Sequence, residues 1–95
     1  MSISIRWLDI SFSTEKMTLP DKDFYLMEKS FAILERKTGV KIDQYSDIKL
    51  SPDHAQILLD NTCKEIFEST VSLKKLYSFL VDSFKKSYWL YLEGD

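Results

Sequence analysis

The stretch ISIRWLDISF, residues 3–12, decides the fold class, because apolar and polar residues alternate along it. The apolar residues share one parity as far as Trp7 and take the other parity from Leu8 onward. A two-residue period is that of a β-strand with one apolar face, so we expect a strand here. The change of parity predicts a β-bulge at Trp7-Leu8, since one extra residue returns the later apolar side chains to the same face. Residues 11–16 are then expected to form a turn.

The residues after this turn carry the signals of a first helix, predicted over about residues 19–38. Thr18 can accept a hydrogen bond from a free backbone N–H of the first turn, and Pro20 lies where its missing N–H is not needed. Gly39 can adopt the left-handed conformation that ends many helices. The residues expected to face the core at helical spacing are Phe24, Met27, Phe31 and Leu34.

Two further helices are predicted over about residues 52–69 and 73–91. Ser51 and Pro52 form a clear start for the first of these, a capping residue followed by proline in the first helical position. The end of the last helix is ambiguous, because residues 88–92 are so aromatic that they also fit a closing strand.

These elements predict an α+β fold. Residues 40–50 indicate two short strands, which we expect to join the N-terminal strand in a small antiparallel sheet with the three helices packed on it. A mostly helical bundle with an N-terminal β arm is the alternative. Ninety-five residues are enough for one core only, so residues 1–95 are expected to form a single compact domain.

Composition limits where the protein acts and what it binds. Cys63 is the one cysteine, so no intrachain disulfide can form, which fits a reducing compartment, and we expect the cytoplasm. No export signal is recognised at Met1, and no apolar stretch approaches the roughly 20 residues that cross a bilayer. The formal net charge of −2 disfavours general nucleic-acid binding.

Few side chains are suited to catalysis. His54 is the only histidine, and no set of residues has the spacing of zinc ligands. Cys63, nine positions away, is expected on the apolar face of its helix as a small core residue. Two glycines are too few for a phosphate-binding loop. We therefore expect no enzyme activity, no metal and no cofactor.

Charge is unevenly distributed along the chain. Residues 43–68 contain six acids and two lysines, a net charge of −4, whereas residues 69–92 contain four lysines and one aspartate, a net charge of +3. Within the acidic part, Ile57 is expected on the outer side of its helix among carboxylates, as an apolar anchor for a basic partner. The alternative is that Ile57 packs under a loop. The residues of this predicted partner-binding face are Asp53, Ile57, Asp60, Asn61, Lys64 and Glu68.

Two other surfaces give alternative hypotheses. Leu19, Leu26 and Ile33 are spaced by seven and form a second apolar line on the first predicted helix, which fits either a central position in the domain or self-association. Trp89, if helical, lies in an arc with Lys85 and other lysines, a pattern that can stack on a base and hold phosphate.

The expected function is non-enzymatic protein-protein interaction. We expect a small inhibitor or immunity-type protein that neutralises a basic partner, such as a nuclease toxin domain, by covering its positive cleft. The alternatives are a small self-associating regulatory or structural subunit and, less favoured, a nucleic-acid-associated protein. The sequence leaves the oligomeric state open, with a monomer favoured.

Overall fold

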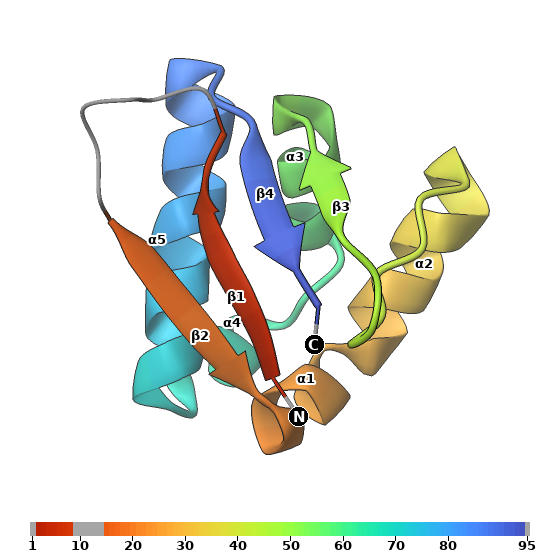
Figure 1. The fold of residues 1–95 in the computed structure, drawn as a ribbon. Helices are drawn as coiled ribbons and strands as arrows, with labels where there is room; N and C mark the ends of the chain where they lie inside the picture. Colours follow the sequence, from red (N-terminus) through yellow and green to blue (C-terminus); the bar gives the residue numbers. More distant parts are fainter. Residues whose placement is uncertain (1, 9–14, 95) are drawn as a thin grey trace.

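The computed structural model describes residues 2–8 and 15–94, which form a mixed α+β domain (Figure 1). The strands are β1 (Ser2–Trp7), β2 (Lys16–Pro20), β3 (Ile48–Leu50) and β4 (Leu90–Glu93). The helices are α1 (Asp21–Leu26), α2 (Glu28–Thr38), α3 (Pro52–Asp60), α4 (Lys64–Glu68) and α5 (Val71–Lys86).

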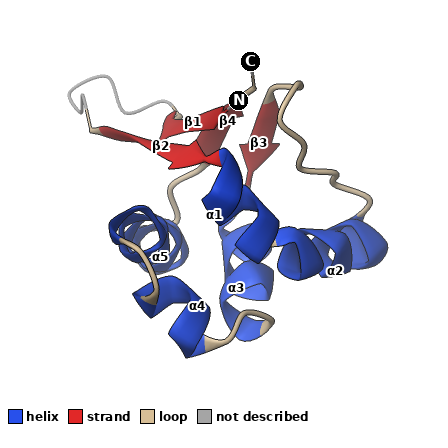
Figure 2. Ribbon diagram, turned by 90° about the horizontal axis from the view of Figure 1, so that it is seen from below, coloured by secondary structure: helices blue, strands red, loops and turns tan. Residues whose placement is uncertain are grey.

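The four strands form one antiparallel sheet in the order β2-β1-β4-β3. Figure 2 shows the helices gathered beneath one face of this sheet, and none of the described helices covers its other face. The expected α+β fold, with a small antiparallel sheet and helices packed on it, is therefore confirmed, and the alternative helical bundle is not the structure.

The alternation in β1 produces this one-sided packing. Ile3, Ile5 and Trp7 are buried on the helix side, whereas Arg6 is exposed on the other face. The Trp7 ring stacks on Phe79 of α5 with centroids 5.0 Å apart, which fixes the sheet against the longest helix. The predicted strand is thus confirmed as far as Trp7, and the rest of it, residues 9–12, lies outside the described residues, as does most of the predicted turn.

The start of the first helix was wrongly predicted. Thr18 and Leu19 belong to β2, where Leu19 pairs with Ile3, and the helix begins only at Asp21. Met17 and Leu19 are both buried, with an exposed residue between them, as in β1. This strand pattern determines the local structure, although Thr18 is also a residue type that caps helices. The helical region then breaks once, at Met27, which is fully buried and separates α1 from α2.

The second predicted helix also breaks, between α3 and α4. Side chains here bind backbone carbonyls: the Asn61 amide donates to the Ile57 carbonyl, and Thr62 Oγ1 donates to that of Leu58. Such local bonds compete with continuation of the helix. Cys63 consequently precedes α4 and is exposed, so the prediction of a core cysteine was wrong.

The remaining boundaries follow the signals at helix ends. Ser51 caps α3, and Gly39, at φ 81°, closes α2, as predicted. Ser87, at φ 58°, ends α5, and the ambiguous residues that follow contain strand β4. Residues 40–50 form one strand, β3, rather than the two predicted.

Burial predicts which leucines stabilise the domain. Leu58→Ala removes a side chain that is 1% exposed and leaves a cavity, so it should lower the free energy of unfolding by about 2–5 kcal/mol. Leu26→Ala is the matched control, because Leu26 is 46% exposed, and its effect should stay within about 0.5 kcal/mol. Urea unfolding followed by circular dichroism measures both, and equal losses would contradict this packing.

Candidate functional site

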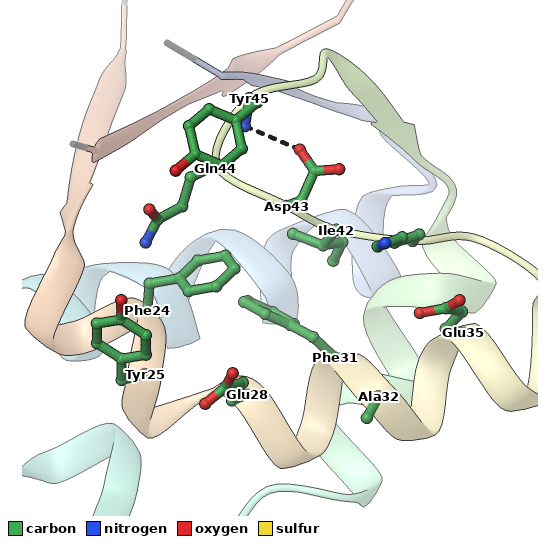
Figure 3. Close-up of a pocket in the computed structure, with 11 residues that line it drawn as sticks. Phe24, Tyr25, Glu28, Phe31, Ala32, Glu35, Ile42, Asp43, Gln44 and Tyr45 are labelled. Atoms are coloured by element: carbon green, nitrogen blue, oxygen red, sulfur yellow. Dashed lines mark hydrogen bonds between the residues drawn. The ribbon is translucent and has the colours of Figure 1, made fainter.

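A pocket of about 360 Å³ opens between the α1–α2 region and the loop that precedes β3 (Figure 3). We call it the α2–loop pocket and define it by the residues that line it. These residues are Phe24, Tyr25, Glu28, Phe31, Ala32, Glu35, Lys41, Ile42, Asp43, Gln44 and Tyr45.

The helical wall of the pocket combines aromatic rings with carboxylates. Phe24 and Phe31 are buried, with ring centroids 5.2 Å apart, and point from the helices toward the loop (Figure 3). Glu28 and Glu35 are exposed and lie seven residues apart on the same side of α2, one on each side of Phe31. Tyr25 is 62% exposed at the edge of this wall. The wall therefore offers an apolar floor with two acids beside it.

The loop wall is shaped by Asp43. Its Oδ1 accepts hydrogen bonds from the backbone N–H groups of Tyr45 and Ser46, both at 2.8 Å. This turn leaves the Tyr45 side chain 65% exposed at the rim of the pocket. The two N–H donors hold the pKa of Asp43 below its ordinary value, so the carboxylate is ionised at neutral pH.

Gln44 is the buried polar side chain of the loop wall. The residue is 8% exposed, and its amide group points into the pocket from the loop toward Phe24 (Figure 3). Within residues 2–8 and 15–94 this amide makes no hydrogen bond with another protein group. The pocket thus contains a donor and an acceptor that a ligand can use.

Contacts with Tyr91 of β4 and with Gly94, which follows β4, hold the loop in place. The Asp47 carboxylate accepts from the Tyr91 hydroxyl at 2.8 Å and from the Gly94 backbone N–H at 3.1 Å. The bond to Asp47 raises the pKa of Tyr91. Gly94 also approaches the loop so closely that an added Cβ would lie 2.6 Å from the backbone N of Ser46. The loop that shapes the pocket is therefore fixed by the last strand.

The turn at Asp43 should make stability depend on pH. A folded-state pKa below the unfolded value of about 3.9 stabilises the fold above that pH, and the contribution is lost as the pH falls through the folded-state value. Asp43→Ala should therefore be less stable than the wild type at pH 7, with a difference that shrinks on acidification below about pH 4. Asp43→Asn keeps a side-chain acceptor for the two backbone N–H groups, so it should lose less stability than Asp43→Ala. Urea unfolding at a series of pH values measures the difference in unfolding free energy between the wild type and Asp43→Ala. A difference that does not vary with pH would contradict this account.

The close approach at Gly94 predicts a displaced loop when a methyl group is added. Gly94→Ala should shift the backbone amide signals of Gln44 to Ser46 in the NMR spectrum and cost about 1–3 kcal/mol of stability, as overpacking does. Gly39→Ala is the control, because its Cβ meets open space and only the left-handed φ is strained. This control should lose stability while the Gln44 to Ser46 signals stay in place. Unchanged loop signals in Gly94→Ala would show that the contact does not position the loop.

The structure divides the partner-binding face predicted from the sequence between two helices. Asp53 and Asp60 are exposed on α3, whereas Ile57 is half-buried and packed against the core. Asn61 is the residue at which α3 ends. The other two predicted residues, Lys64 and Glu68, are on α4.

These two residues form an ion pair with each other. Lys64 Nζ lies 3.9 Å from Glu68 Oε1 in an exposed ion pair. They also line a second pocket, of about 410 Å³, together with Phe67 and Tyr77, whose rings lie 5.1 Å apart. The predicted face is therefore not one continuous helical surface.

The residues of the two alternative surfaces lie in different elements from those predicted from the sequence. Leu19 is buried in β2, Leu26 is exposed on α1 and Ile33 is half-buried on α2, so they share no helical line. Trp89 is not helical: it lies between α5 and β4, is 45% exposed, and its carbonyl accepts from the Leu8 N–H. The arrangements on which self-association and base stacking depended are thus absent from the described residues.

His54 has a local structural role. Its Nδ1 accepts from the Ser51 backbone N–H, while Ser51 Oγ accepts from the His54 N–H, so the two residues form a reciprocal cap at the start of α3. In the parts of the chain that the structure covers, no group of three or more His, Cys, Asp or Glu residues is placed to hold a metal ion.

The uncovered face of the sheet carries a row of cations. Lys16, Arg6, Tyr91 and Lys49 are register partners across the four strands. The Arg6 guanidinium lies 4.6 Å from the centroid of the Tyr91 ring, and its Nε lies 3.4 Å from Glu93 Oε1. Arg6 thus already contacts Tyr91 and pairs with a carboxylate. The row is therefore a weak candidate site for an anionic ligand, and the pocket is the stronger candidate site.

No protein-family model matches the chain, and comparisons with curated proteins and with solved structures give no match either. Among the described helices, none combines the length and the apolar character that crossing a bilayer requires. The function must therefore be argued from the α2–loop pocket and the charge around it.

The sequence did not predict this pocket, although the spacing of residues on its helical wall could have indicated that wall. Glu28, Phe31 and Glu35 have the spacing of one helical face, which places acids beside the apolar stripe. The contribution of Gln44 and Tyr45 had no such signal, because it depends on the path of a loop.

Proposed function

We propose that this chain is a non-enzymatic protein-binding module of the inhibitor or immunity type, whose partner is a basic protein. The observation that carries the proposal is the α2–loop pocket, where exposed tyrosines on both walls frame carboxylates. Tyr25 and Tyr45 are 62% and 65% exposed, and aromatic residues of this kind are common anchors of protein interfaces.

The sign of the charge around the pocket favours a basic partner. The residues that line the pocket include three carboxylates, Glu28, Glu35 and Asp43, and one cation, Lys41. Carboxylates at the rim attract a positive surface over a distance and exclude an acidic one. Asp53 and Asp60, exposed on α3, add to the negative potential of the molecule.

The proposed mechanism is coverage of a functional surface. A nuclease holds its nucleic-acid substrate with clustered Lys and Arg, so its active cleft is itself cationic. An acidic module that binds there competes with the phosphate backbone and blocks the enzyme without any chemistry of its own. The proposal places this action in the cytoplasm, because a domain with a single cysteine needs no oxidising compartment.

Affinity capture with variants tests this function. The tagged wild-type chain should retain a protein of net positive charge from its source cell at low ionic strength. Glu28→Lys combined with Tyr45→Ala should weaken that complex by roughly 30-fold or more, as loss of a hot spot does. Both positions are exposed, so circular dichroism should show a native fold.

Two further variants separate the surfaces. Glu65→Lys makes the same charge reversal on α4 at an exposed position outside the pocket, and it should leave the affinity nearly unchanged. Asp53→Lys with Asp60→Lys should mainly slow association and weaken its salt dependence, as rim charges do. The proposal fails if the retained proteins are acidic, or if the pocket variant binds as tightly as Glu65→Lys.

A further inference from the structure

The Gln44 side chain is the feature of the pocket that the proposed function leaves unexplained. Gln44 is 8% exposed and aimed into the pocket, and its amide has no hydrogen-bond partner among the described residues (Figure 3). Its amide atoms are not among the buried polar atoms without a partner in the described residues, so the amide opens into the pocket and can be hydrated there. A ligand that displaces this water without replacing its hydrogen bonds loses affinity. A ligand that supplies this partner is therefore favoured over one that only fills the space.

The other lining groups restrict the ligand further. Glu28, Glu35 and the ionised Asp43 outnumber Lys41, the one cation among the lining residues, so the pocket disfavours phosphate or carboxylate groups. A purely apolar ligand would bury acids near itself and leave the Gln44 amide unpaired, which is unfavourable. The ligand that suits the pocket must be cationic, must donate hydrogen bonds and must have an apolar or planar part for the rings.

An arginine side chain has all three properties. Its guanidinium is planar, stacks on aromatic faces, and carries five N–H donors for carboxylates and amide carbonyls. A lysine ammonium is a compact, more strongly hydrated charge that does not stack as a plane. The volume of about 360 Å³ lies in the range of about 300–1,000 Å³ typical of ligand pockets, so one long side chain can enter.

We propose that the α2–loop pocket receives one arginine side chain of the basic partner. The guanidinium stacks against an exposed tyrosine, Tyr25 or Tyr45, and donates to Glu28 or Glu35 at the rim. The carbonyl oxygen of Gln44 accepts a further N–H inside the pocket. This inference rests on the proposed function, since the arginine is supplied by the protein partner.

A small probe tests the pocket without the partner. N-acetylarginine amide is titrated into the full chain and followed by two-dimensional NMR, including the side-chain amide signals of Gln44. Saturable shifts should appear at Gln44 and at its pocket neighbours, with a weak affinity in the millimolar range. N-acetyllysine amide should bind several times more weakly, and N-acetylcitrulline amide, which has the same shape without the charge, should not bind.

One variant isolates the amide of Gln44. Gln44→Met keeps the length of the side chain, so the protein should be at least as stable as the wild type, because no protein hydrogen bond is lost. Its affinity for the arginine probe should fall about tenfold or more, since hydrogen bonds to charged groups are strong. Gln56→Met, at an exposed position on α3 outside the pocket, is the matched control and should bind like the wild type.

The outcomes separate this inference from the function on which it rests. Absence of pocket shifts, equal binding of the lysine or citrulline probe, or unchanged binding by Gln44→Met overturns the arginine site, even if a basic partner is captured. Selective binding of the arginine probe supports the site. If that binding is seen while no basic protein is captured, the proposed function fails and the guanidinium site stands as a property of the pocket.

Discussion

The pairing of β4 between β1 and β3 is the constraint on which the rest of the structure depends. It joins the last described residues to the first strand and to the loop before β3, so β1 and β4 lie side by side in the centre of the sheet (Figure 1). Leu90 and Leu92 then complete the apolar face that the helices cover. The same pairing brings Gly94 against Ser46 and gives Asp47 its two donors. Removing β4 from the sheet would therefore free the loop wall of the pocket as well as open the core.

The helical wall is held by a different set of contacts. α1 has six residues, too few to be stable as an isolated helix, so tertiary contacts must fix it. Asp23 is buried, and its Oδ2 accepts from Thr70 Oγ1, while that same hydroxyl oxygen accepts from the Leu73 N–H at the start of α5. Ser30 of α2 is tied to the α3–α4 break by its bond to the Asn61 carbonyl. The helical wall of the pocket is thus attached to the core through half-buried polar bonds, whereas the bonds that hold the loop wall are exposed.

Local patterns predicted β1 and the start of α3, but they missed the break between α3 and α4 and the strand assignment of Leu19. The alternation before Trp7 and the cap at Ser51 were read correctly, because their signals lie within a few residues. Leu19 was assigned to a helix because Thr18 and Pro20 resemble a helix start, whereas pairing with Ile3 makes it a strand residue. The pocket could be predicted only on its helical side. Its loop side depends on contacts between residues 47 positions apart, which no short pattern contains.

The attachment of the loop to β4 bears on how the proposed partner would be recognised. A mobile binding loop loses conformational entropy when it is ordered by a partner, and this loss reduces the affinity. Here the Asp43 turn and the two bonds to Asp47 fix the loop before any partner arrives. The Gln44 amide, which has no hydrogen-bond partner among the described residues, opens into the pocket, and the Tyr45 ring is exposed at its rim. A loop that its own protein fixes with these groups turned outward is preorganised, so a complex would gain their contacts without first having to order the loop.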